Sequence, residues 1–169
     1  IGIIGINGSG KTTFLKILAG LEEADEGQVI TQNGLRITYL SQHPEFPEGA
    51  TILSYVTQGQ KDKSWNPETE AHMVLNKLGI EDHEEEIDHL SGGQKKRVAL
   101  AAVLVNPTDV LILDEPTNHL DITSKEILES ALRSYTGTVF YVSHDRYFIN
   151  KTATRLLDLT GGHLNEYKG

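Results

Sequence analysis

The 169-residue sequence contains no cysteine, which excludes disulfide bonds and thiolate metal sites. This absence suits a reducing compartment, and we expect a cytoplasmic protein. Basic residues are also scarce, with 15 Lys and Arg against 24 Asp and Glu and a formal net charge of -9. Their main cluster is Lys95–Arg97. This balance argues against a chain that itself wraps nucleic acid by electrostatic attraction.

Long apolar runs are missing as well. No run approaches the roughly 18 residues that a membrane-spanning helix needs, and no secretory signal is visible. The length suffices for one well-buried domain and is too short for two. Because the sequence starts inside an apolar strand pattern at Ile1 and stops after a hairpin pattern at Gly169, we expect a piece of a longer protein with truncated N-terminal strands.

The segment GINGSGKT, Gly5–Thr12, fits the phosphate-loop pattern, with a strand pattern before it and a helix pattern after it. Backbone N–H groups of such a loop turn toward a phosphate, Lys11 reaches the β- and γ-phosphates, and Thr12 offers its hydroxyl to Mg²⁺. An ordinary glycine-rich turn is the alternative. The predicted nucleotide-binding residues of this loop are Asn7, Gly8, Ser9, Gly10, Lys11, Thr12 and Thr13.

A second motif is the acidic segment VLILDE, which places Asp114 and Glu115 at the end of an apolar strand. Ligands of open α/β sheets bind at the carboxyl ends of strands. Since side chains alternate along a strand, we expect the two acids to differ in role. Asp114 is predicted to hold Mg²⁺ and Glu115 to activate the attacking water. Two solvated acids at a strand end are the alternative.

Two further polar residues follow predicted strands. His144, in YVSHD, could donate to the γ-phosphate, although a histidine without this context would more often be structural. Gln42, at the end of ITYLSQ, could bridge Mg²⁺ and the attacking water, and its pattern alone leaves a structural role equally open. We therefore predict Glu115, His144 and Gln42 as catalytic residues, and Thr12, Gln42 and Asp114 as metal ligands.

The remaining patterns predict an α/β core of residues 1–45 and 107–169 with a helical subdomain, 46–106, inserted in it. The core is expected to have a mostly parallel sheet flanked by helices. Asn33-Gly34 predicts a hairpin within Gln28–Gln42, and Gly161-Gly162 predicts another at the C-terminus. A helix is expected from about Thr123 to Tyr135. The fold class is thus that of a P-loop NTPase, as one domain over residues 1–169.

The stretch LSGGQ, Leu90–Gln94, has the spacing of a helix capping box. It would leave the Ser91 hydroxyl and N–H groups at a positive helix end. A capped helix is the simple interpretation. Because the phosphate loop and Ser91 fall in different predicted subdomains, a second interpretation is an anion site that closes over a nucleotide held by a partner domain. Two domains would then enclose two ATP molecules, head to tail.

Together, the phosphate loop, Gln42, LSGGQ, LILDE and His144 resemble, in order, the nucleotide-binding domain of ABC ATPases. The resemblance implies ATP and Mg²⁺ as ligands, a second ABC ATPase domain in the same full-length chain or in a dimer, and nucleotide contacts from Ser91, Gly92, Gly93, Gln94 and Asp121. DEPTNHLD and SHDRYFIN are similar to the ABC-F branch. That similarity implies an ATPase that acts on the ribosome and tRNA during translation, through regions outside this chain.

The sequence departs from the family in two places. The aromatic residue that stacks on adenine in the family precedes the phosphate loop, and this chain begins after that position. The passage TQGQKDKSWNPETE, Thr57–Glu70, is shorter than the family's region between Gln42 and Ser91.

Two other functions remain open from the sequence. The chain could be the ATP-binding subunit of a membrane transporter, which would require a groove for a membrane partner. It could also be a nucleotide-gated binding module with little turnover, against which Glu115 argues.

Overall fold

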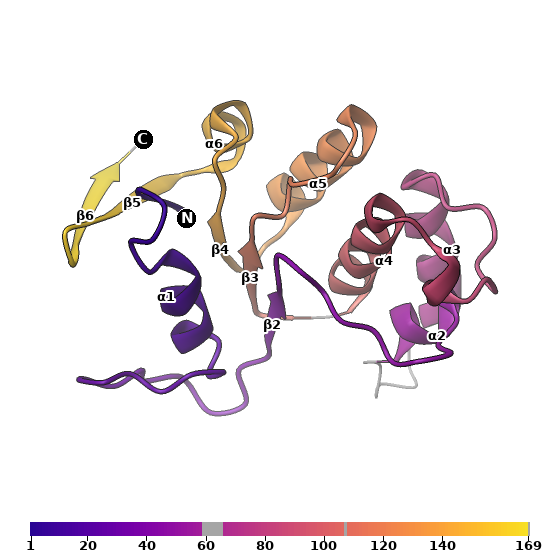
Figure 1. Ribbon diagram of the computed structural model, residues 1–169, viewed down its shortest axis with the longest axis horizontal. Helices are drawn as coiled ribbons and strands as arrows, with labels where there is room; N and C mark the ends of the chain where they lie inside the picture. The colour runs from indigo at the N-terminus through magenta and orange to yellow at the C-terminus, as the bar shows by residue number, and fades with distance from the viewer. Residues whose placement is uncertain (59–65, 107, 169) are drawn as a thin grey trace. The chain divides into compact units, whose positions relative to one another are not determined.

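The computed structural model describes residues 1–58, 66–106 and 108–168. Its contacts divide the chain into two units, shown in Figure 1, which we describe separately. The sheet unit consists of Ile1–Gln42, Thr108–Thr117 and Leu132–Gly169, and the helical unit of His43–Pro107 and Asn118–Ala131. The predicted division placed residues 118–131 in the core, whereas their contacts lie with the helical unit. A Cβ added at Gly93, for example, would lie 3.6 Å from the His119 carbonyl oxygen.

The sheet unit holds one six-stranded sheet in the order β2-β3-β4-β1-β5-β6. Its strands are β1 (Gly2–Ile4), β2 (Ile37–Leu40), β3 (Val110–Asp114), β4 (Thr138–Val142), β5 (Arg155–Thr160) and β6 (His163–Lys168). All neighbouring strands are parallel except β5 and β6, which form an antiparallel hairpin. The predicted mostly parallel sheet and the C-terminal hairpin are therefore confirmed.

One face of the sheet is covered by α1 (Lys11–Leu18) (Figure 1). Leu15 is fully buried there against Ile3, Ile112 and Val142, which come from β1, β3 and β4. The apolar run of β3 is explained by its central position, because a central parallel strand is buried on both faces. Burial of this helix face fixes the start of α1, and with it the end of the phosphate loop.

The opposite face carries Tyr141 of β4, whose side chain alternates with those of Phe140 and Val142. Tyr141 packs edge-on against Phe148 of α6 (Arg146–Thr152), with ring centroids 5.2 Å apart. Both side chains are almost fully buried. This contact holds the segment that follows β4, including His144, against the sheet.

The predicted hairpin within Gln28–Gln42 is wrong. Residues 28–36 form no strand, and Val29 and Ile30 are exposed. Instead, β2 pairs in parallel with β3, in the register Ile37 to Val110. The Asn33-Gly34 turn is present, with Gly34 at a φ of 79°, but the residues before it lack a strand to pair with.

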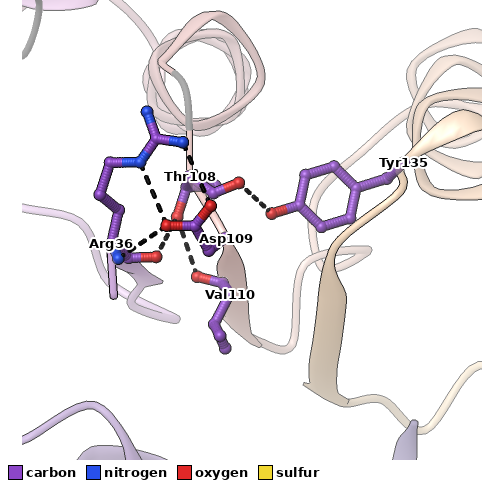
Figure 2. A network of polar contacts seen from close by, with 5 residues as sticks. All are labelled: Arg36, Thr108, Asp109, Val110 and Tyr135. Carbon is purple, nitrogen blue, oxygen red and sulfur yellow. Dashed lines mark hydrogen bonds and ion pairs between the residues drawn. The ribbon is translucent and has the colours of Figure 1, made fainter. Parts of the chain in front are cut away.

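A polar network fastens the first residues of this strand pair (Figure 2). The Arg36 guanidinium donates to both carboxylate oxygens of Asp109 at 3.1 Å, and the Arg36 backbone N–H donates to the same carboxylate at 2.9 Å. The Thr108 hydroxyl donates to the Arg36 carbonyl, and the Tyr135 hydroxyl donates to the Thr108 carbonyl at 2.6 Å. The network thus fixes the β2–β3 register at the edge of the sheet where both strands begin.

The helical unit consists of α2 (Ile52–Thr57), α3 (Pro67–Lys77), the 3₁₀ helix η1 (Ile87–His89), α4 (Gly92–Val105) and the first part of α5 (Ile122–Ser134). Side chains cap the starts of α2, α3 and α4. The Asn66 side chain caps α3, with Pro67 at the first helical position. Within the passage Thr57–Glu70, residues 59–65 lie outside the described residues.

None of the helices that the structure describes is long and apolar enough to cross a membrane.

Candidate nucleotide site

The phosphate loop joins the end of β1 to the start of α1 in the sheet unit. Gly10 precedes the helix at a φ of 90°, a left-handed conformation that costs little only for glycine. Gly5 lies so close to β5 that an added Cβ would be 2.5 Å from the Leu159 carbonyl oxygen. Ser9 has a buried hydroxyl that makes no hydrogen bond among the described residues. A close backbone turn, a helix N-terminus and a spare hydroxyl suit a phosphate group.

Lys11 is largely buried within this loop. Its ammonium group donates hydrogen bonds to the carbonyl oxygens of Gly5 and Ile6, at 2.8 and 2.9 Å. These carbonyls belong to the loop itself, so the charge is held where a bound phosphate would be recognised. Asn7, Gly8, Thr12 and Thr13 are exposed around it.

Thr12 and Asp114 connect the loop to the sheet. The Thr12 hydroxyl donates to Asp114 Oδ2 at 2.9 Å, and the Tyr39 hydroxyl lies 3.4 Å from the same oxygen. Burial and the neighbouring Asp114 carboxylate raise the pKa of Tyr39 to about 12. The other carboxylate oxygen, Asp114 Oδ1, is buried and makes no hydrogen bond among the described residues.

This donor set fits Mg²⁺. A hydroxyl and a carboxylate are hard oxygen ligands, which this ion prefers, and it is usually bound by one or two carboxylates together with substrate phosphates. An unpaired buried carboxylate oxygen is costly unless a cation or a donor satisfies it. Thr12 and Asp114 could therefore hold the ion between the loop and β3.

Glu115 and His144 face each other at the same edge of the sheet. His144 Nε2 lies 3.1 Å from Glu115 Oε1, and the His144 backbone N–H donates to Glu115 Oε2 at 3.3 Å. Burial raises the pKa of Glu115, while the nearby His144 opposes that shift. A buried carboxylate with a raised pKa is a suitable general base.

Asp114 and Glu115 make different contacts, as expected, but the alternation of side chains along a strand is not the whole cause. The strand β3 ends at Asp114, and Glu115 adopts a φ of 47° in the left-handed region, which is uncommon for a residue with a side chain. Its backbone N–H still bonds the Val142 carbonyl at 2.9 Å. The turn directs Glu115 toward His144, whereas Asp114 faces Thr12 and Tyr39.

Gln42 lies two residues beyond the end of β2. Because Leu40 of β2 pairs with Leu113 of β3, Gln42 follows its strand at the same carboxyl edge at which Asp114 and Glu115 stand. The structure thus assembles the predicted residues of the sheet unit along one edge of the sheet.

The other predicted residues lie in the helical unit. Ser91 caps α4, with its hydroxyl accepting from the Gln94 N–H at 3.3 Å and the Gln94 side chain accepting from the Ser91 N–H at 2.9 Å. Gly92 and Gly93 form the first positions of this helix. Asp121 precedes α5 and accepts from the Ser124 N–H. Hydrogen bonding with Ser124, chiefly with its side chain, lowers the pKa of the Asp121 carboxyl. The predicted capping box is present.

The sequence interpretation missed a pair of buried hydroxyls beside the two acids. Thr117 and Ser143 lie 3.2 Å apart, two residues after Glu115 and one before His144. Their positions next to predicted site residues were the available signal. Tyr39, in contact with Asp114, was also missed.

Comparison with known proteins identifies the family. The family model described as ABC transporter matches residues 1–118. The chain belongs to this family. The prediction of an ABC-type ATPase domain is thereby confirmed.

Two curated relatives match the whole chain. The chain is 39% identical over 207 residues to the uncharacterized ABC transporter ATP-binding protein YfmR of Bacillus subtilis, of which it covers 33%. It is 32% identical over 208 residues to the energy-dependent translational throttle protein EttA of Haemophilus influenzae, of which it covers 37%. The chain thus spans about a third of the length of these relatives.

A solved structure of an ATP-binding cassette has a similar fold. It is the dimeric structure of a post-hydrolysis state of an ATP-binding cassette bound to ADP and Pi, which is 26% identical with a TM-score of 0.82. The match covers 99% of this chain and 84% of that one.

Proposed function

We propose that this chain binds and hydrolyses ATP at the edge of its sheet. The observation that carries the proposal is the hydrogen bond between Thr12 and Asp114, which joins the phosphate loop to β3 beside an unpaired carboxylate oxygen. A glycine-rich turn without a nucleotide role would not need an aligned acid of this kind.

Each residue of the sheet unit then has a task. The loop N–H groups and Lys11 bind the β- and γ-phosphates, and Thr12 and Asp114, with Gln42, hold Mg²⁺. When bound, the ion neutralises the charge of the phosphate oxygens. Glu115 accepts a proton from the water whose oxygen attacks the γ-phosphorus, while the bond from that phosphorus to the bridging oxygen breaks. ADP leaves with the bridging oxygen, and His144 orients Glu115 and the γ-phosphate.

The experiment that tests this function is the Glu115→Gln substitution. An amide keeps the shape of the side chain but cannot accept the proton. We expect MgATP affinity, measured by calorimetry, to stay within a few-fold of the parent value, while hydrolysis slows by at least about 100-fold, the lower range for a general base. Turnover at the parent rate would remove Glu115 from the role of base.

For the full-length protein we propose a cytoplasmic ABC-F translation factor, in which this domain works with a second ATPase domain as a head-to-tail pair. The support is the similarity to EttA, whose name describes a translational throttle, together with DEPTNHLD and SHDRYFIN. In this pair, Ser91–Gln94 and Asp121 contact the nucleotide that the partner domain holds. None of the site residues proposed above is assigned to stacking on adenine.

The ribosome role is tested by cosedimentation of the full-length protein carrying Glu115→Gln. If ATP prolongs a ribosome-bound state, the variant should sediment with ribosomes in ATP and remain in the supernatant without nucleotide. Recovery with a membrane subunit, and no ribosome binding in either state, would favour a transporter instead.

A further inference from the structure

Two buried hydroxyl groups come from the segments that carry Glu115 and His144. Thr117 and Ser143 are 4% and 3% exposed, and their oxygens are 3.2 Å apart. A buried hydroxyl without a partner is unfavourable, and Ser143 supplies a partner for the Thr117 hydroxyl. Thr117 is two residues from Glu115 in the chain, and Ser143 is adjacent to His144.

Ser143 makes a second contact. Its Oγ accepts a hydrogen bond from the Asp145 backbone N–H at 3.1 Å, and either hydroxyl can donate in the Thr117–Ser143 bond. The Asp145 carboxylate in turn accepts from the Phe148 N–H and caps α6. Ser143 is therefore fixed on one side by the start of α6 and on the other by Thr117.

The bridge lies just beyond the regular pairing of β3 and β4. The last register pair of these strands is Asp114 with Val142. After it, the Glu115 N–H reaches the Val142 carbonyl, and the Thr117–Ser143 bridge continues the connection between the two loops. Glu115 belongs to the first of these contacts, and His144 directly follows Ser143 of the second.

We propose that Thr117 and Ser143 are positioning residues that hold His144 in contact with Glu115. The inference rests on the proposed role of Glu115 as the general base. The hydrogen bonds that the structure gives these hydroxyls join them to each other and to Asp145, beside Glu115 and His144, so we expect the bridge to act on hydrolysis and not on nucleotide binding. A displacement of about 1 Å at a reacting group can cost roughly 100-fold in rate, and we expect kcat to fall by about 10- to 100-fold when the bridge is lost.

The test compares Thr117→Val, Ser143→Ala and the double variant in the full-length protein. Valine keeps the shape of threonine without the hydroxyl. Each single variant should lower kcat by a similar factor, and the double variant should lower it no further, because the two groups form one bridge. The MgATP dissociation constant should stay unchanged. Thr117→Ser, which keeps the hydroxyl, should retain the parent rate.

Two measurements separate positioning from general loss of structure. Hydrogen exchange of the His144 amide, which donates to Glu115, should accelerate in each single variant. Thr160→Val is the matched control, because it removes an exposed hydroxyl bonded to Asp158 at 2.6 Å and should change neither rate nor exchange. If Thr117→Val does not fold, Ser143→Ala carries the same test, since it removes a single oxygen atom.

The outcomes distinguish this inference from the proposed function. Parent kcat and parent exchange in Thr117→Val and Ser143→Ala would overturn the positioning role even if Glu115→Gln is inactive. If Glu115→Gln hydrolyses ATP at the parent rate, the proposed function itself fails. Additive losses in the double variant would also contradict a shared bridge.

Discussion

At the scale of single residues, Lys11 makes the sharpest prediction about binding. Its ammonium group is held by two loop carbonyls and is expected to turn to the β- and γ-phosphates. Hydrogen bonds to charged groups contribute about 1.5–3 kcal/mol each, so Lys11→Ala should weaken MgATP binding by at least about 10- to 100-fold. Calorimetry with MgATP measures this change directly.

Lys16 supplies the matched control for that substitution. It lies on the same helix, but its ammonium group pairs with Glu22 at 3.4 Å on the surface. Lys16→Ala should therefore leave the affinity for MgATP unchanged. Equal affinity in the parent and in Lys11→Ala would place the nucleotide elsewhere.

The residues of the candidate site were predictable where a motif has fixed spacing. Gly5–Thr12 and the acids after β3 follow such spacing, and the fold brings Thr12 to Asp114 as expected. The Thr117–Ser143 bridge was not predictable, because serine and threonine are usually exposed and a single sequence does not show which hydroxyls are buried together. The left-handed turn at Glu115 also depends on tertiary contacts and carries no glycine signal.

At the scale of elements, α1 ties the phosphate loop to the sheet through Leu15. This side chain is fully buried, whereas Leu21, just after the same helix, is 60% exposed. Removing a buried leucine side chain costs about 2–5 kcal/mol, so Leu15→Ala should lower the free energy of unfolding by that amount. Leu21→Ala, the matched control, should change it by less than about 0.5 kcal/mol. Urea unfolding of both variants checks the difference, and equal losses would contradict the packing of α1.

The start of the β2–β3 pair makes a prediction about pH. The Arg36 side chain is the main cause that holds the pKa of the Asp109 carboxyl below its ordinary value of 3.8. A carboxyl whose pKa is lowered by folding stabilises the fold fully above 3.8, and this contribution is lost as the pH falls through the folded pKa. An NMR titration should therefore find the Asp109 midpoint below 3.8, and Arg36→Gln should raise it.

Arg155→Gln is the control for this titration. Arg155 pairs with Glu166 in the C-terminal hairpin at 2.7 Å, away from Asp109, and its removal should leave the Asp109 midpoint unchanged. A midpoint at or above 3.8 in the parent chain would show that the network in Figure 2 does not form in solution.

The elements that were predicted correctly combine a strong local signal with burial. The capping box of α4 and the apolar run of β3 are examples. The hairpin within Gln28–Gln42 failed because a turn signal at Asn33-Gly34 says nothing about which strand β2 will pair with. That choice is made by β3, which is distant in sequence but offers a fully buried partner edge.

At the scale of the whole molecule, the two parts of the proposed site lie in different units. Lys11, Asp114 and Glu115 belong to the sheet unit, and Ser91 to the helical unit. We propose that Ser91 contacts a nucleotide held by another domain. It follows that the specific ATPase activity of this chain should rise with its concentration as pairs form. A specific activity independent of concentration would argue for a site completed within one chain.

The most direct test mixes two inactive chains, one with Ser91→Ala and one with Glu115→Gln, at a concentration where the parent chain hydrolyses ATP. In a mixed pair, the intact Ser91 of the Glu115→Gln chain contacts the nucleotide bound by the Ser91→Ala chain, whose Glu115 is intact. We expect each variant to be nearly inactive alone and the mixture to regain ATPase activity through this one composite site. If mixing restores nothing while the parent chain is active, catalysis in trans is contradicted and LSGGQ is only a capped helix start.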